Sequence, residues 1–94
     1  MSTPSEDRFQ LQIARSAALA LTDSLPEKVA HAVYQFIVGP LLVNPHRVGR
    51  PLNPPLAPAY SARRGDYRVL YLIDDASKTV RVTAIRHRAD AYGT

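Results

Sequence analysis

Two short strands joined by a tight turn are the feature that most limits what this chain can fold into. The sequence Tyr-Ser-Ala-Arg-Arg-Gly-Asp-Tyr-Arg-Val-Leu-Tyr-Leu-Ile occupies residues 60–73 and breaks at Gly65-Asp66, a dipeptide suited to a two-residue turn. The second strand alternates, with one face made by Tyr67, Val69, Tyr71 and Ile73 and the other by Arg68, Leu70 and Leu72. The sequence therefore predicts an antiparallel hairpin.

Arg68 shares its face of this strand with apolar side chains. A guanidinium group does not lose its charge, so an arginine on a half-buried strand needs an anionic partner. That partner is either a carboxylate of the same chain or the phosphate of a ligand, and local physics leaves both open. The nearby Arg63 and Arg64 favour the phosphate.

Positive charge is concentrated in the second half of the chain. Residues 46–94 carry nine basic and four acidic side chains, whereas residues 1–45 carry three basic and four acidic ones. Ten of the twelve basic residues are arginines, which suit bidentate phosphate contacts and stacking on bases. A genome rich in arginine codons explains the count better than it explains the clustering. A nucleic-acid partner is therefore the first inference, and an acidic protein partner the second.

Length and composition restrict the class of protein. We expect residues 1–94 to form a single domain, with residues 1–8 as a disordered leader. There is no run of eighteen apolar residues and no signal peptide, which predicts a cytoplasmic protein without membrane contact. The absence of cysteine excludes disulfides and thiolate metal sites.

One strand and two helices are expected before the hairpin. Residues 9–13 alternate as a short strand, and residues 14–22 are rich in alanine and leucine, which favours a helix. A second helix should begin near Ser24, which can cap it with Glu27 in the capping-box position, and run to about Val38. Its apolar side chains fall on one face at helical spacing: Val29, Val33, Phe36 and Ile37.

The segment from Pro40 to Pro58 carries six of the eight prolines and is predicted to be a crossing loop with Leu52 and Leu56 tucked beneath it. Residues 78–85 alternate as a last strand, with one face made by Val80, Val82 and Ala84. The element order β-α-α-β-β-β predicts an α+β fold. In it, an αα-hairpin covers one face of a mainly antiparallel sheet, and the other face stays open.

One group of basic and aromatic side chains suggests chemistry: Arg63, Arg64, Arg68, Arg86, His87, Arg88 and Tyr92. The three histidines lack metal-ligand spacing and no glycine-rich phosphate loop is present, so neither a metal nor a cofactor is expected. Arginines can stabilise a phosphorane-like transition state, a histidine can transfer protons, and a tyrosine can stack on a base. The alternative is that these arginines only solvate a sheet edge. His46, Arg47 and Arg50 are expected to lie in a solvated loop that binds no ligand.

These residues resemble the RelE/ParE toxin superfamily, and within it the RelE-type branch of bacterial type II toxin–antitoxin systems. The resemblance rests on Leu25-Pro26, on residues 61–71 with the following Ile73-Asp74-Asp75, and on His87-Arg88-Ala89-Asp90-Ala91-Tyr92. It implies a cytosolic toxin neutralised by a cognate antitoxin, which also reads the operator DNA. RelE-type members cut mRNA in the ribosomal A site: the 2′-hydroxyl attacks the adjacent phosphate without a metal.

The resemblance also implies roles for individual residues. Arg68 matches the strand arginine that contacts the scissile phosphate, and Arg86 matches the basic residue that protonates the leaving oxygen. Tyr92 matches the tyrosine that stacks on a base, and Arg63 matches a supporting basic position. Arg63 is accordingly expected to bind RNA phosphates, and Arg64 and Arg88 are expected to do so as neighbouring members of the basic group.

The chain departs from the family pattern at Ala59 and Ser61, where well-studied RelE toxins place two lysines implicated in activating the nucleophile. His87 would then have to serve as base or acid, or Arg64 would have to compensate. Two other functions stay open for this reason. One is a ParE-type toxin that inhibits DNA gyrase by binding, and the other is a weakly active toxin that mainly forms the antitoxin complex.

Overall fold

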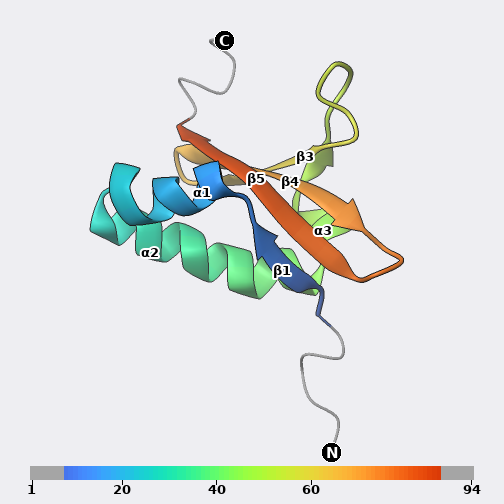
Figure 1. Cartoon of the computed structure of the whole chain (residues 1–94), viewed down its shortest axis with the longest axis horizontal. Coiled ribbons are helices and arrows are strands. Elements are labelled where there is room, and N and C mark those ends of the chain that lie inside the picture. The colour runs from blue at the N-terminus through green and yellow to red at the C-terminus, as the bar shows by residue number, and fades with distance from the viewer. Residues whose placement is uncertain (1–7, 88–94) are drawn as a thin grey trace, which may run out of the picture.

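The computed structural model describes residues 8–87, which form a twisted sheet with helices packed on one face (Figure 1). The elements are β1 (Gln10–Ile13), α1 (Arg15–Leu19), η2 (Ala20–Ser24), α2 (Glu27–Phe36), η3 (Ile37–Leu41), α3 (Pro45–Val48), β2 (Arg50–Pro51), β3 (Tyr60–Arg64), β4 (Tyr67–Asp74) and β5 (Thr79–His87). The strand order is β1-β5-β4-β3-β2, and β1 pairs with β5 in parallel while the other pairs are antiparallel. The predicted α+β fold is confirmed.

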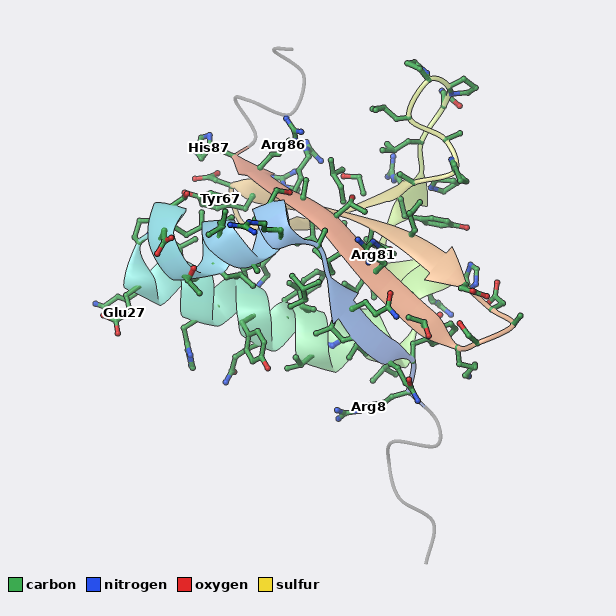
Figure 2. The ribbon with its side chains drawn as sticks, viewed as in Figure 1. Arg8, Glu27, Tyr67, Arg81, Arg86 and His87 are labelled. Carbon is green, nitrogen blue, oxygen red and sulfur yellow. The ribbon has the colours of Figure 1, made fainter. Side chains whose placement is uncertain are left out.

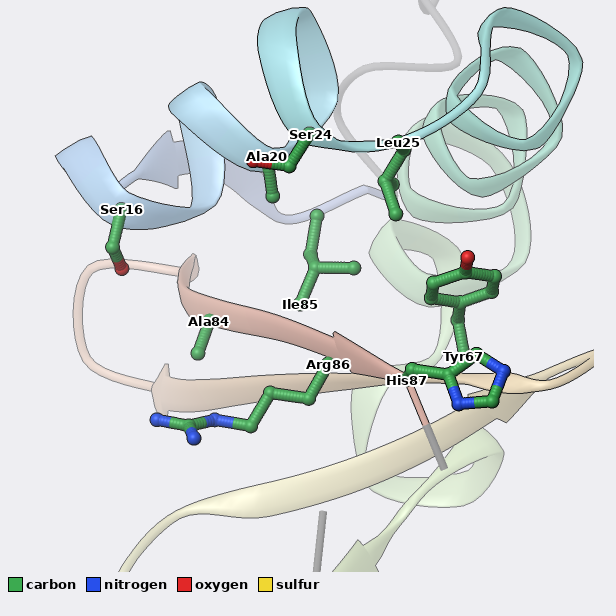
Figure 3. A pocket seen from close by; sticks show the side chains of 9 residues that line it. All are labelled: Ser16, Ala20, Ser24, Leu25, Tyr67, Ala84, Ile85, Arg86 and His87. Carbon is green, nitrogen blue, oxygen red and sulfur yellow. The ribbon is translucent and has the colours of Figure 1, made fainter. Parts of the chain in front are cut away.

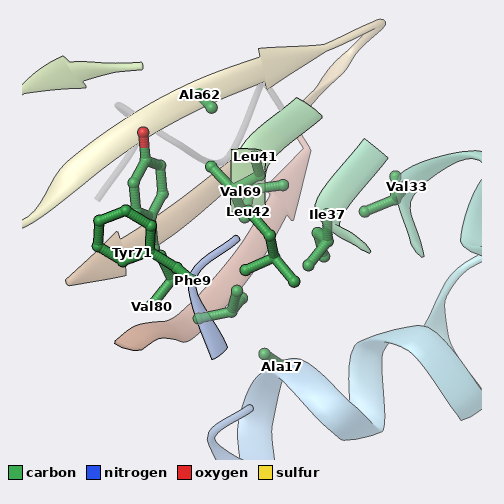
Figure 4. Packing of buried hydrophobic residues seen from close by; sticks show 11 residues of the cluster. Phe9, Ala17, Val33, Ile37, Leu41, Leu42, Ala62, Val69, Tyr71 and Val80 are labelled. Carbon is green, nitrogen blue, oxygen red and sulfur yellow. The ribbon is translucent and has the colours of Figure 1, made fainter. Parts of the chain in front are cut away.

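The core lies between the helices and the sheet (Figure 4). Burial of each large apolar side chain stabilises the fold by about 1.5–3 kcal/mol, so the alternation of β4 fixes which of its faces meets the helices. The fully buried side chains come from both layers and include Ala17, Val33, Ile37, Leu41, Ala62, Val69, Tyr71, Val80 and Val82. Among residues 8–87, no helix lies against the opposite face of the sheet (Figure 1).

The helices differ from the prediction where they begin and end. The first helix continues from α1 into η2, a π-helical turn in which the Leu25 amide donates to the Ala20 carbonyl at 2.9 Å. The predicted Ser24 cap is wrong, because Pro26 occupies the N-cap position of α2 without a side-chain cap bond. The second helix passes its predicted end and continues through η3, whose wide turn contains Pro40. No helix in residues 8–87 is long and apolar enough to cross a membrane.

Strand β5 contains a bulge that the sequence pattern did not predict. Leu70 pairs with Ala84, but the next residue of β4, Tyr71, pairs with Val82. Thr83 is therefore an extra residue on β5 that opposes no residue of its own. A bulge of one residue reverses the alternation of side chains on the strand beyond it.

Hydrogen bonds hold the bulge from both sides, and the bulge changes which face of the sheet the following residues of β5 occupy. The Thr83 hydroxyl donates to the Leu70 carbonyl at 3.2 Å, and the Ser16 hydroxyl of α1 donates to the Thr83 carbonyl at 2.9 Å. Beyond the bulge, Ile85 packs against the core while Ala84 faces the open side with Leu70. The prediction that Ala84 shares a face with Val80 and Val82 is therefore wrong.

The proline-rich segment is more ordered than predicted, since it contains α3 and β2. Pro45 begins α3 at a position where its missing N–H costs nothing. The loop between β2 and β3 projects away from the sheet (Figure 1). Its two ends are joined by a hydrogen bond in which the Leu52 amide donates to the Ala59 carbonyl at 2.9 Å. Leu56 is 57% exposed on this projection, so its predicted burial is wrong.

Helix α3 is tied to the sheet by Tyr71. The Tyr71 side chain is fully buried, and its hydroxyl donates to the Pro45 carbonyl at 2.6 Å. Burial, together with the neighbouring Tyr60, raises the pKa of Tyr71, because the ionised ring would be poorly solvated. A second tether joins His46 to Asp75 at 2.8 Å, but both side chains are exposed and this pair adds little stability.

We expect Tyr71→Phe to lower the free energy of unfolding by about 1–3 kcal/mol, because the Pro45 carbonyl loses its buried donor. A raised pKa stabilises the fold at pH values below the ordinary tyrosine value of 10.0, and this contribution is lost as the pH rises through the raised value. The difference between wild type and variant should therefore shrink at alkaline pH. Urea denaturation at neutral and alkaline pH measures both effects. Tyr34→Phe, on the exposed face of α2, is the matched control; equal losses for the two variants would contradict the assignment.

Candidate functional site

The turn between β3 and β4 sets the register of the candidate site. Gly65 has a φ of 61°, in the left-handed region that glycine adopts without strain, and Asp66 completes the two-residue turn. This turn places Arg63 opposite Arg68 and Arg64 opposite Tyr67. The Arg63 Nε atom donates to the Gly65 carbonyl at 3.3 Å, which holds that side chain near the turn.

Three arginines lie in one row across the open face of the sheet. Arg63 on β3 pairs with Arg68 on β4, and Arg68 pairs with Arg86 on β5. Residues directly opposite on antiparallel strands point to the same side, with Cβ atoms about 4.5–5.5 Å apart. We call Arg63, Arg68 and Arg86 the arginine row.

The arginine row faces away from the helices. Val69 and Tyr71 of β4 are buried on the helix side, so Arg68 points to the open side, and the bulge at Thr83 directs Arg86 to that same side. Arg68 is half-buried, while Arg63 and Arg86 are exposed. An anion bound over the row would meet guanidinium groups from three strands at once.

Two of the predicted site residues lie on the other side of the sheet. His87 pairs with Tyr67, and the two rings make an edge contact with centroids 5.1 Å apart. Figure 3 shows His87 beside Tyr67, while Arg86 extends in another direction. Arg64 also pairs with Tyr67 and shares that side. The structure therefore brings together Arg63, Arg68 and Arg86, but not Arg64 or His87.

Arg88 and Tyr92 lie outside the described residues, so their predicted roles stay predictions. Ser61, at one of the positions where the family pattern has lysine, is on the open face opposite Leu70. Its hydroxyl is buried and has no hydrogen-bond partner in the described part of the chain. Ala59 precedes β3 and its carbonyl accepts the bond from Leu52.

Two further arginines share the open face, and the sequence did not predict either. Arg50 pairs with Ser61 through β2, a strand too short and too rich in proline to be recognised. Arg81 pairs with Leu72, and it lies on the same side as Arg86 only because of the bulge. Arg81 and Arg86 are labelled in Figure 2. Among residues 8–87, no carboxylate forms an ion pair with Arg50, Arg81 or Arg86.

A cavity of about 560 Å³ lies on the helix side, between η2 and the end of β5 (Figure 3). Strand β1 pairs with β5 only from Thr79 to Val82, so within the described residues the rest of β5 has no strand on that side. The cavity is lined by Ser16, Ala20, Ser24, Leu25, Tyr67, Ala84, Ile85, Arg86 and His87. An unpaired strand edge beside a partly apolar hollow can accept an added segment of another chain.

The open face is suited to a polyanion and to chemistry at a phosphate. Guanidinium groups donate paired, charge-assisted hydrogen bonds to phosphate oxygens. Asp74 is the acidic residue that β4 places at the far end of this face, and its Oδ1 atom accepts the amides of Ala76 and Ser77 at 3.0 and 3.2 Å. A carboxylate engaged in its own turn does not neutralise the arginine row at the other end of the strand.

The chain matches a family model over residues 7–92, described as the ParE toxin of the type II toxin–antitoxin system parDE. Among individual proteins it is 48% identical over 84 residues to Toxin RelE of Mycobacterium tuberculosis, a match that covers 89% of this chain and 86% of that protein. It is 50% identical over 68 residues to Toxin RelG of the same organism, covering 72% of this chain and 78% of that protein.

The fold is also found in solved structures. The crystal structure of the toxin–antitoxin complex RelBE2 from Mycobacterium tuberculosis contains a chain that superposes with a TM-score of 0.81 and 41% sequence identity. The superposition covers 86% of this chain and 99% of that chain.

Proposed function

We propose that this chain, which belongs to the family of ParE toxins of type II toxin–antitoxin systems and is a RelE/ParE-type toxin, is a ribosome-dependent mRNA endonuclease that stops translation. The observation that carries the proposal is the arginine row, with three guanidinium groups aligned across three strands of an open face. The similarity to Toxin RelE and Toxin RelG supports the RelE branch of the superfamily.

In the proposed reaction, the 2′-oxygen of one nucleotide attacks the adjacent phosphorus, and the bond from phosphorus to the 5′-oxygen breaks. The 2′-hydroxyl loses its proton and the leaving 5′-oxygen gains one, which yields a 2′,3′-cyclic phosphate and a 5′-hydroxyl. Arg68, in the centre of the row, donates to the phosphate oxygens as negative charge accumulates in the transition state. Arg63 supports it from β3.

Arg86 is the residue that we assign to the leaving 5′-oxygen, because it is adjacent to Arg68 on the next strand. The residue that accepts the proton of the 2′-hydroxyl is not assigned. His87 was predicted for proton transfer, but its side chain lies on the helix side with Tyr67. The proposal for the described residues therefore rests on charge stabilisation by the arginine row, and Tyr92 stays a prediction as the base-stacking residue.

We infer a cognate antitoxin as the protein partner of this toxin. The similar chain from Mycobacterium tuberculosis was solved as a toxin–antitoxin complex. The cavity beside the unpaired edge of β5 is a place where an antitoxin segment can add to the sheet. Operator DNA would then be contacted through the antitoxin, while the open basic face is left for the ribosome and mRNA.

A second candidate function is inhibition of DNA gyrase by binding, without chemistry in the toxin. The matching family model describes ParE toxins, and Ala59 and Ser61 stand where RelE-type toxins carry two lysines. A weakly active toxin that mainly forms the antitoxin complex is the third. Both alternatives use the arginine row as a binding surface only.

Primer extension on a reporter mRNA in a translation reaction tests the proposal. We expect cuts within codons of the translated message when the toxin is present, and none when ribosomes are omitted. Pre-incubation with the antitoxin should abolish the cuts. Intact mRNA at toxin concentrations that inhibit gyrase supercoiling would reject the endonuclease and select the second function.

A further inference from the structure

Arg81 is a basic position on the open face that stands apart from the arginine row. It pairs with Leu72 on β4, and Gln12 on β1 pairs with it from the other side. Its side chain is exposed, and no carboxylate of residues 8–87 pairs with it. Within the described part of the chain, Arg81 therefore presents a positive charge without a carboxylate partner, in the middle of the sheet rather than at its edge.

The bulge in β5 is what brings Arg81 and Arg86 to the same face. The two residues are five positions apart, and side chains alternate along a strand, so an uninterrupted β5 would place them on opposite faces. Thr83 is the extra residue between them, and both its hydroxyl and its carbonyl are hydrogen bonded. Bulges interrupt a ladder and are found where a side chain must be re-aimed.

The spacing between Arg81 and the arginine row suits one RNA strand. Arg81 lies level with Leu72, four residues along β4 from Arg68, which is about 14 Å at about 3.4 Å per residue. Phosphates of one stacked strand are about 3.4 Å apart along the helix axis, so this distance spans about four stacked nucleotides, or fewer extended ones.

On β4 and β5 the surface between these two basic levels is apolar, while Arg50 lies at the intermediate level on the edge strand β2. Leu70 lies there on β4, with Ala84 beside it on β5 and Ser61 beside it on β3. Along β4 and β5 the open face thus has arginines at two levels and apolar side chains between them. This matches a nucleic acid strand, in which bases and sugars lie between phosphates.

We propose that Arg81 is a second phosphate-binding residue for the RNA strand, and that it holds the mRNA several nucleotides away from the phosphate at the arginine row. The proposal rests on the proposed function in that it takes the RNA strand as its ligand. Arg81 does not touch the reacting atoms. It lowers the dissociation constant for RNA strands that are long enough to reach both Arg81 and the arginine row.

Two RNA lengths and two variants test this proposal. The probes are a fluorescent dinucleotide and a fluorescent single strand of about eight nucleotides, both 2′-O-methylated so that they cannot be cut. We expect Arg81→Gln to weaken binding of the longer probe about tenfold and leave the dinucleotide unaffected. The slope of log affinity against log salt should fall by about 0.7 for the lost phosphate contact. Arg15→Gln removes the same charge from exposed α1 and should change neither.

The outcomes separate this proposal from the proposed cleavage. Equal affinities of Arg81→Gln and Arg15→Gln for the longer probe would overturn the role of Arg81, whether or not the wild type cuts mRNA. Equal weakening of both probe lengths, or no detectable binding of the longer probe by wild type, would overturn it too. Length-dependent weakening in a protein that cuts no mRNA would reject the cleavage and keep the binding position. Matching thermal unfolding of both variants establishes that the fold is unchanged.

Discussion

Arg68→Ala is expected to reduce mRNA cleavage by a factor of about 10²–10³, because it removes the central donor to the phosphate where transition-state charge develops. Arg68 is flanked on the same face by Arg63 and Arg86, and neither neighbour can take its central position. Arg68→Lys should recover only part of the activity, since an ammonium keeps the charge but not the planar pair of donors. Primer extension over a time course measures the rates.

The matched control for Arg68→Ala is Arg15→Ala, which removes an exposed arginine from the helix side. It should cut mRNA at the wild-type rate. Thermal unfolding of Arg68→Ala must be measured as well, because a half-buried side chain also packs against its neighbours. Full cleavage and unchanged growth arrest in a folded Arg68→Ala protein would show that the arginine row is not the active site.

Gly49→Ala is expected to destabilise the fold by about 3–5 kcal/mol, which combines overpacking with the loss of a buried hydrogen bond. A Cβ atom on Gly49 would overlap the Tyr71 hydroxyl and lie 2.8 Å from the Ser61 carbonyl oxygen. The Tyr71 ring is fully buried and hydrogen bonded to Pro45, so it cannot move aside without losing that bond. The cost arises from this contact, since the Gly49 backbone is extended, with a φ of −123°.

Gly39→Ala is the control for Gly49→Ala, because a Cβ atom at Gly39 meets nothing within 4 Å. Gly39 lies within η3, where alanine is favoured over glycine by about 0.5–1 kcal/mol. Urea denaturation should therefore show a lower midpoint for the Gly49 variant and an equal or higher one for the Gly39 variant. Wild-type stability in Gly49→Ala would mean that α3 is not packed against Tyr71 as described.

The parts of the fold that could be predicted from the sequence depend on neighbouring residues. Alternation in β4 identifies the buried face of the sheet, and Gly65 identifies the turn that sets the register of the hairpin. Together these two local signals are enough to place Arg63 opposite Arg68. The two helical segments before the proline-rich segment could be predicted for the same reason, since apolar residues recur at helical spacing within each of them.

The parts that could not be predicted depend on residues far apart in the sequence. The bulge at Thr83 is stabilised by Ser16 and Leu70, and neither contact leaves a local signature in β5. For this reason the prediction from strict alternation put Ala84 on the wrong face of the sheet. It also gave no indication that Arg81 and Arg86 lie on the same face. Strand β2 could not be predicted because it consists of only Arg50–Pro51 and is defined by its pairing with β3.

The bulge makes the open face sensitive to the number of residues in β5 as well as to their identity. A strand that kept Thr83 but paired it regularly would turn Arg86 towards the helices and expose Ile85 in its place, whereas deleting Thr83 would restore a regular ladder and leave Arg86 opposite Arg68. Removing one paired residue beyond the bulge would reverse the face of every residue after it, whereas removing two would preserve the alternation and shorten the strand. When members of this family are compared, an aligned arginine therefore lies on the same face only if the number of paired residues between it and the buried valines is odd or even as it is here, with any bulge residue left out of the count. Insertions and deletions in this strand can thus change function without altering any aligned residue.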